Sequence, residues 1–234
     1  MTRTEKKFIA TPLDRDRLGE LPGERLDADP TQANSISLNV IAVGANGVTL
    51  GYTGLNGNHP STYGNAVFVW QNEAAIPYGA PPLATTPLKG NSPSGTTSVE
   101  FDVKMGLDYV LGYSTGGTVE SIASWAYIPP QEEGFQYFST TTAPVPGGVT
   151  SDVVVAKYST PAGNDAGANK NWVGIWVAST GSFTNPPKFR ADAPSGATGR
   201  VPVHGTYTRD TTYTIGYFTG KSLTTLAATC TFST

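Results

Sequence analysis

The sequence predicts an all-β protein, with two tandem antiparallel β-sandwiches preceded by a charged N-terminal arm. Composition is the first reason: of 234 residues, 27 are glycine and 18 are proline, while charged residues make up only 14%. Frequent turns between short strands use such a composition, whereas long helices need runs of Ala, Leu, Glu, Lys and Arg. The other two reasons are an abrupt change in charge near residue 33 and an internal repeat.

The arm is predicted over residues 1–33. It holds six basic and seven acidic residues, out of 15 basic and 18 acidic residues in the whole chain. Its few apolar side chains cannot bury much surface by themselves. We expect either a loose terminus or an arm that docks elsewhere, and the anchors of a docking arm would be Phe8, Ile9, Leu13 and Leu18.

An internal repeat occupies the rest of the chain. VTLGYTGLNGNHPSTYGNAVFVWQN, from Val48, aligns without a gap on VVAKYSTPAGNDAGANKNWVGIWVA, from Val154. Further on, DYVLGYSTGGTVESIA, from Asp108, aligns on TYTIGYFTGKSLTTLA, from Thr212. Glycine, asparagine and aromatic positions coincide in both alignments, which is typical of a duplicated structural unit.

The repeat sets the expected domain boundaries. We predict β-sandwich repeat 1 over residues 34–130 and β-sandwich repeat 2 over residues 138–234. The segment 131–137 would be a short linker, and the prolines and acidic pair in IPPQEEGFQYF favour this interpretation.

Short strands should fill each repeat. ISLNVIAV, NAVFVW and DYVLGY in the first copy are rich in β-branched and aromatic residues, as are VVVAKY, NWVGIW and TYTIGY in the second. About seven strands in roughly 100 residues is the size of an immunoglobulin-like sandwich, and a barrel is the alternative. Helix should be confined to short turns.

One motif invites a catalytic interpretation. GYSTG, residues 112–116, matches the G-x-S-x-G pattern that presents a nucleophilic serine between a strand and a helix. The residues that follow are typical of a strand, and the second copy has Phe218 where the first has Ser114. We therefore expect a structural turn, no catalytic residue and no enzymatic activity.

Metal and cofactor sites are not expected. The two histidines, His59 and His204, occupy non-equivalent positions in the copies, and Cys230 is the only cysteine. Zinc and calcium sites need more ligands than these, and Asp165 is the only carboxylate in the two Asn- and Gly-rich loops. No phosphate-binding glycine motif is present either.

Charge and hydropathy bear on partners and location. The net charge of -3 argues against a nucleic-acid partner, and no apolar run approaches the roughly 20 residues of a membrane span. The N-terminus lacks the apolar stretch of a secretory signal, so we expect a cytoplasmic protein, with leaderless export as the alternative.

Aromatic residues give the candidates for binding. Trp70, Trp172 and Trp176 are expected in the core, where Gly174 would let a ring pack over its strand. Loop aromatics beside Asn and Asp can stack on sugars or peptides. The candidate ligand or partner contacts are Tyr63, Tyr78, Asn164, Asp165 and Phe183.

NWVGIW, residues 171–176, resembles the D/N-W-[IV]-G-[ILF] strand of SKICH-type and related immunoglobulin-like domains, and the Tyr-containing strand VVVAKYS precedes it. The resemblance covers the central strands of one copy, whereas Ala66 and Phe68 replace the Trp and Gly in the other. It implies an antiparallel β-sandwich used for binding or membrane targeting without catalysis, and it assigns no ligand-contact residues.

Three functions follow as hypotheses. The first is a non-catalytic structural or interaction protein that self-associates into a homo-oligomer through its N-terminal arm by β-augmentation. The second is a carbohydrate-binding module or cytosolic lectin with two binding units. Its ligand would be a glycan, whereas the ligand of an interaction protein would be another protein. The third is a secreted effector or toxin with the tail as an export tag.

Overall fold

The computed structural model describes residues 21–131, 134–177 and 183–234. Nearly all regular structure there is β-strand in antiparallel sheets, which confirms the all-β prediction, and the only helical pieces are 3-10 turns such as η2 (Val119–Ser121) and η3 (Leu223–Thr225). The predicted arm anchors Phe8, Ile9, Leu13 and Leu18 lie outside the described residues. The strands are β1 (Asp29–Ser35), β2 (Ser37–Gly44), β3 (Gly47–Thr53), β4 (Ala66–Gln71), β5 (Ala84–Pro87), β6 (Ser94–Glu100), β7 (Tyr109–Ser114), β8 (Ile122–Ile128), β9 (Gln136–Ser139), β10 (Thr141–Val149), β11 (Val153–Ser159), β12 (Trp172–Val177), β13 (Phe189–Asp192), β14 (Thr198–His204), β15 (Thr212–Phe218) and β16 (Leu226–Ser233).

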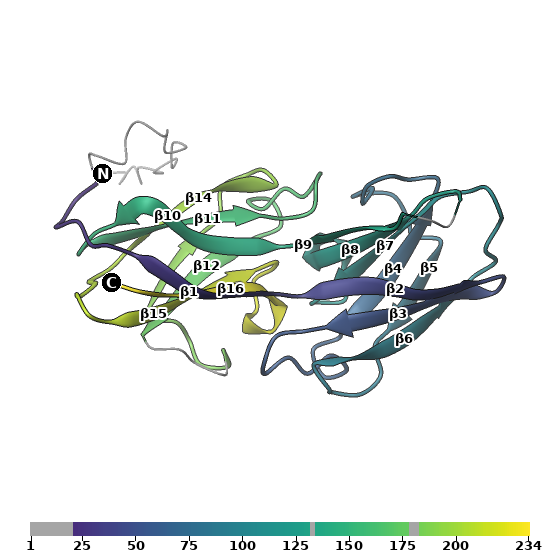
Figure 1. Ribbon diagram of the computed structural model, residues 1–234, viewed down its shortest axis with the longest axis horizontal. Helices are drawn as coiled ribbons and strands as arrows, with labels where there is room; N and C mark the ends of the chain where they lie inside the picture. The colour runs from purple at the N-terminus through teal and green to yellow at the C-terminus, as the bar shows by residue number, and fades with distance from the viewer. Residues whose placement is uncertain (1–20, 132–133, 178–182) are drawn as a thin grey trace, which may run out of the picture.

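The strands form two sandwiches that lie end to end (Figure 1). In the first sandwich, the sheet β2-β3-β6 packs on the sheet β5-β4-β7-β8-β9. In the second sandwich, the sheet β10-β11-β14 packs on the sheet β13-β12-β15-β16-β1. The two sandwiches therefore have the same strand order, with β1 of the second in the place that β9 has in the first.

Each sandwich receives its fifth strand from the segment that begins the other. β1 pairs with β16 in the second sandwich, and the chain then passes through the buried Ile36 into β2 of the first. β9 pairs with β8 in the first sandwich, and the chain passes through the buried Thr140 into β10 of the second. The two crossing residues have equivalent hydrogen bonds, from Ile36 N to Ala227 O at 3.1 Å and from Thr140 N to Ala123 O at 2.8 Å.

The crossing strands bear on the predicted boundaries. The boundary after residue 33 falls inside β1, and the end of the predicted linker at residue 137 falls inside β9. One hydrophobic cluster also contains core residues of both sandwiches, among them Val67 and Val173. The division into two separate domains therefore stays a prediction.

Equivalent turns meet where the two sandwiches join. Thr115, in the turn after β7, and Thr219, in the turn after β15, occupy matching positions of the repeat. Their hydroxyl oxygens lie 2.8 Å apart and share a hydrogen bond. A residue that contacts its own counterpart lies next to a pseudo-twofold axis, so the sandwiches are arranged almost as the two copies of a symmetric dimer.

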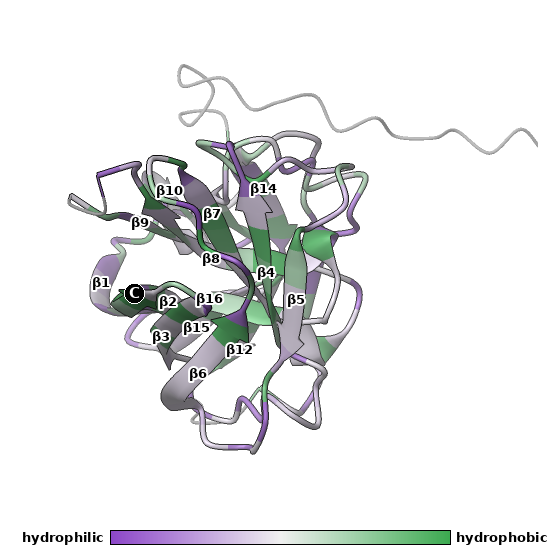
Figure 2. Ribbon diagram, turned by 90° about the vertical axis from the view of Figure 1, so that its right-hand side faces the viewer, coloured by the Kyte–Doolittle hydropathy of each residue, from purple (hydrophilic) through white to green (hydrophobic). Residues whose placement is uncertain are grey.

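The sandwich cores are built from alternate residues of the central strands. Val67 and Val69 of β4 belong to the shared core, while Phe68 and Trp70 form a separate cluster on the other face of the sheet. Trp172 and Trp176 of β12 are likewise buried on that outer face, together with Phe218. The tryptophans are therefore buried as expected, but outside the space between the sheets. Figure 2 shows hydrophobic residues on strands such as β4 and β7.

The glycine in NWVGIW makes room for these rings. A Cβ atom at Gly174 would lie 2.9 Å from both the Trp172 and the Trp176 rings. Real Cβ atoms do not approach other atoms so closely. The expectation that Gly174 allows aromatic packing over the strand is confirmed.

A buried polar network explains the asparagines and tyrosines that recur in both copies. Asn65 donates a hydrogen bond from Nδ2 to the Tyr113 hydroxyl at 2.8 Å, and Asn171 donates to the Tyr217 hydroxyl at 3.0 Å. Both asparagines are fully buried. Because an unpaired buried donor is costly, the two tyrosine hydroxyls stabilise the fold by accepting from these amides.

Ser114 belongs to the turn that follows β7. It is fully buried, and its hydroxyl donates a hydrogen bond to the Thr118 carbonyl at 2.7 Å. The η2 turn and then strand β8 follow, in place of a helix. The GYSTG pattern is thus a closed strand-to-strand connection.

Candidate functional site

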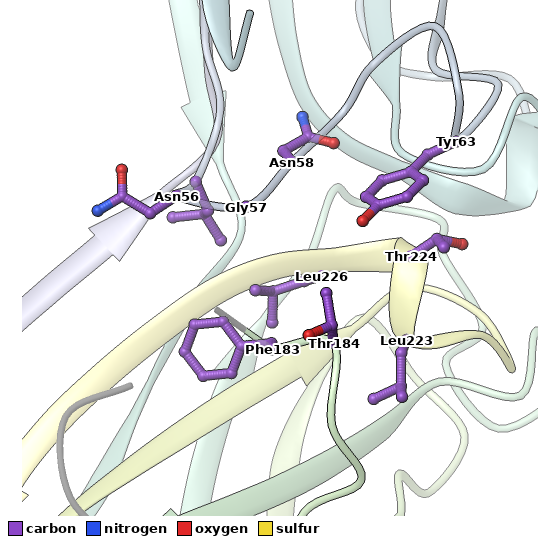
Figure 3. Close-up of a pocket in the computed structure, with 10 residues that line it drawn as sticks. Asn56, Gly57, Asn58, Tyr63, Phe183, Thr184, Leu223, Thr224 and Leu226 are labelled. Atoms are coloured by element: carbon purple, nitrogen blue, oxygen red, sulfur yellow. The ribbon is translucent and has the colours of Figure 1, made fainter. Parts of the chain in front are cut away.

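A groove runs along the junction of the two sandwiches. Its narrow end has a cavity volume of about 140 Å³, and it lies between the loop 54–65 of the first sandwich and the η3 turn and Phe183 of the second (Figure 3). A wider part of about 540 Å³ shares Leu55, Asn56 and Phe183 with the narrow end, and continues over the outer face of β1, β16 and β15. We call the two parts together the junction groove.

The narrow end combines an apolar floor with a polar rim. Leu55, Phe183, Leu223 and Leu226 provide apolar surface, while Asn56, Tyr63 and Thr224 provide amide and hydroxyl groups. Figure 3 shows Tyr63 of the first sandwich extending toward Thr224 of the second.

Neighbouring rings hold the two aromatic side chains of the groove in place. The Tyr63 ring meets the His59 ring edge to face, with centroids 5.5 Å apart. The Phe183 ring meets the Trp176 ring in the same way at 4.9 Å, and the Trp176 indole donates to the Asn185 carbonyl at 3.1 Å. Aromatic pairs favour this geometry, so the groove is largely preformed.

The wide part is polar and carries no formal charge. Gln32 and Asn34 of β1 expose their amides there, beside Thr229 and Thr231 of β16. The Thr231 hydroxyl lies 3.1 Å from the Thr214 hydroxyl, and the two share a hydrogen bond. Among the described residues that line the groove, none is Asp, Glu, Lys, Arg or His.

The first sandwich has a different surface at the equivalent place. By strand register, Trp125 and Tyr127 of β8 stand where Thr229 and Thr231 stand in β16, and Phe138 stands where Asn34 stands in β1. The Trp125 and Phe138 rings stack with centroids 6.0 Å apart. The polar wall of the junction groove is thus particular to the second sandwich.

The structure brings together two of the five residues that the sequence suggested as ligand contacts. Tyr63 and Phe183, far apart in the chain, both line the junction groove. Tyr78 lies on the other side of the junction, where a Cβ atom at Gly163 would be 3.3 Å from its ring, and burial raises the pKa of Tyr78.

The other two suggested residues have local roles in the loop after β11. Asn164 is buried, and its amide bonds to the Thr160 hydroxyl at 2.9 Å and to the Asn169 amide at 2.6 Å. Asp165 is exposed, and backbone N–H donors, with Ala168 first among them, lower the pKa of its carboxyl group.

Sequence reasoning missed the residues of the wide part, above all Gln32, Asn34, Thr229 and Thr231. Threonines are abundant in the chain, and nothing in the sequence indicates that β1 pairs with β16. Asn56 had a visible signal, because it belongs to the Asn- and Gly-rich loop GLNGNHP.

The described residues contain no group of three or more His, Cys, Asp and Glu side chains placed to hold a metal ion. In the same part of the chain, no helix is long and apolar enough to cross a membrane.

No protein-family model matches the chain, and no curated protein matches it. The resemblance of NWVGIW to SKICH-type domains therefore stays an expectation.

Proposed function

We propose that the chain is a non-catalytic carbohydrate-binding protein that holds an uncharged saccharide in the junction groove. The observation that carries this proposal is the lining of the groove, where the described residues join apolar and aromatic surface to amides and hydroxyls without a charged side chain. A sugar ring has apolar C–H faces and many hydroxyl groups. Aromatic rings cover the former, and Asn, Gln and Thr both donate to and accept from the latter.

Saccharide binding is tested with neutral oligosaccharides on a glycan array, followed by calorimetry on the best binder. We expect Asn34→Ala and Asn56→Ala, which remove exposed amides on opposite walls, each to weaken binding about three- to tenfold, as loss of one hydrogen bond does. Phe183→Ala should weaken it at least as much, because it removes the apolar surface.

Asn39→Ala is the matched control, because Asn39 is an exposed amide on β2, outside the groove. It should leave the affinity unchanged. The proposal is wrong if no neutral saccharide binds saturably, or if the two groove asparagines can be replaced without loss of affinity.

The exchanged strands favour a second candidate function, self-association. β1 pairs with β16 through residues Asp29 to Ser35, and β16 of a second copy would offer the same hydrogen bonds. Exchange of this strand between chains would build dimers or longer assemblies without a new interface.

Cross-linking distinguishes pairing within a chain from pairing between chains. Ala33 of β1 lies directly opposite the native Cys230 of β16. Oxidation of an Ala33→Cys variant should therefore join the two strands through a disulfide, because directly opposed residues of an antiparallel pair have a Cα separation within the disulfide range. Covalent dimers on a non-reducing gel, absent when Cys230→Ala is added, would support self-association. A cross-link confined to single chains would contradict it.

A further inference from the structure

The second sandwich carries a cluster of positive charge that the first lacks. A cavity of about 400 Å³ at the end of β12 and β13 is lined by Gly167, Lys170, Asn171, Arg190, Asp192 and Lys221. Only nine Lys and Arg residues follow residue 33, in a chain of net charge -3, and three of them line this cavity. A single carboxylate accompanies them, so the local charge is positive.

Stacked rings fix the position of Arg190. Its guanidinium lies 4.1 Å from the centre of the Trp172 ring, and the opposite face of Trp172 stacks on Phe218 with centroids 3.8 Å apart. The Trp172 indole also donates to the Gly220 carbonyl at 2.8 Å, next to Lys221. Arg190 reaches Asp192 at 3.6 Å through one nitrogen, and a guanidinium has five N–H donors in all.

Lys170 adopts a backbone conformation that side chains avoid. Its φ angle is +59°, and the equivalent residue of the first sandwich, Gly64, has a φ angle of +71°. Glycine occupies this left-handed region freely, whereas other residues are strained there. Strained residues of this kind gather at functional sites.

Lys221 stands where the first sandwich has no room for a side chain. The equivalent residue is Gly117, and a Cβ atom there would lie 2.6 Å from the Gly64 carbonyl oxygen. In the first sandwich, the backbone turns at Gly64 and Gly117 thus fill the space that the cavity occupies in the second. In the second sandwich the same two positions carry lysines, and by strand register Arg190 stands where the first has Thr85.

We propose that this basic cavity binds a tetrahedral oxyanion, namely a phosphate or sulfate group. An arginine binds such oxygens through paired N–H donors, and lysines add point charges around it. The lysines are exposed, so salt should weaken binding. The cavity shares no lining residue with the junction groove, so the proposal is independent of saccharide binding there.

The test is an NMR titration of the ¹⁵N-labelled full chain with inorganic phosphate and, separately, sulfate, at constant ionic strength. Acetate is the comparison for a carboxylate. The reporters are the amides of Lys170 and Lys221 and the indole N–H of Trp172. We expect saturable shifts with phosphate or sulfate and binding at least tenfold weaker with acetate.

The variant Lys170→Gly/Lys221→Gly installs the residues that the first sandwich has at both positions, so it should fold normally. We expect it to bind phosphate and sulfate at least tenfold more weakly. Lys89→Gln/Lys104→Gln removes two exposed lysines of the first sandwich and should bind as the unaltered chain does. The proposal is overturned if no saturable shift occurs, if acetate binds as tightly, or if the double glycine variant retains its affinity.

Discussion

The buried tyrosines make the stability of the protein sensitive to alkaline pH. Burial is the main cause that raises the pKa of Tyr113 to about 12, against a partial opposing effect of the hydrogen bonds from Asn65 and Asn58. Burial also raises the pKa of Tyr158, another residue of the core, to about 12. An ionised phenol is poorly solvated at such sites, so the folded protein keeps these protons longer than the unfolded chain does.

The free energy of unfolding should therefore have its full value below pH 10 and should fall as the pH rises toward 12. In that window the unfolded chain, with ordinary tyrosine pKa values near 10, releases protons that the folded protein retains. For Tyr113 alone the loss reaches about 3 kcal/mol once the pH has passed 12. Urea unfolding at pH 8, 10 and 11, with phenolate absorbance in parallel, measures this loss.

Tyr113→Phe provides the control for that measurement. It should lower the free energy of unfolding at pH 8 by about 1–3 kcal/mol, because it removes the hydroxyl that accepts from the buried amides of Asn58 and Asn65 and leaves them only the hydrogen bond to each other. It should also flatten the decline between pH 10 and 12. A free energy of unfolding that is constant over this range in the unaltered protein would contradict the assignment.

At the scale of elements, the role of the N-terminal strand β1 could not be predicted from the sequence. β1 covers the edge of β16, and the preceding Leu26 is buried, with its N–H bonded to the Val149 carbonyl at 2.9 Å. The ion pair between Glu24 and Arg209 is exposed and should add little. Burial and strand pairing thus hold this segment on the second sandwich.

A chain that begins at Ser37 should lose this strand and expose the edge of β16. We expect a lower melting temperature and a tendency to aggregate, because an unpaired edge offers free N–H and C=O groups. A synthetic peptide of residues 22–36 should restore the melting temperature, and a scrambled peptide should not. An equal melting temperature for the shortened chain and the full chain would contradict this role of β1.

Most central strands could be predicted from their side chains, as could the edge strand β2, but the edge strands β1 and β10 could not. NAVFVW, DYVLGY and NWVGIW correspond to β4, β7 and β12 within one residue. β1 reads DPTQANS, and β10 reads TTAPVPGGV with two prolines and two glycines. Proline is tolerated on edge strands, and the pairing there is decided by the partner strand, which no local pattern reveals.

At the scale of the whole molecule, the chain closes almost into a ring. Asp29, at the start of β1, lies opposite Ser233, near the C-terminus. In the first sandwich the equivalent strands, β8 and β9, are joined by residues 129–135. The second sandwich therefore has the same pair of strands with the connection left open.

A circular permutant should fold to the same structure. It would begin at Gln136, run to Thr234, continue through a copy of residues 129–135 to Asp29, and end at Ile128. We expect an unchanged circular dichroism spectrum and one cooperative transition, with a modest loss of stability because the contacts of Leu26 are removed. Failure to unfold cooperatively would show that the order of the two halves matters to the fold.

The candidate site could not be predicted from the sequence as a whole, because its residues come together only when the two sandwiches meet. Tyr63 and Phe183 could be suggested because loop aromatics are uncommon and suited to ligands. Their proximity depends on how the sandwiches meet, including the contact of Thr115 with Thr219, and a repeat in a sequence does not show which of its residues face their counterparts.

The position of the two ends also determines how the protein would respond to mechanical tension. Tension on both ends would first release the segment before β1, which is held at Leu26. Because Asp29 and Ser233 are neighbours at one end of an antiparallel pair, it would then load the β1–β16 hydrogen bonds one after another, finishing at Ser35 and Ala228. Each such bond contributes only about 1 kcal/mol, so the strand would peel away at low force. If the chain were tethered at both ends, its first extension would come from the release of the segment before β1 and then of β1 itself, while the first sandwich stayed folded.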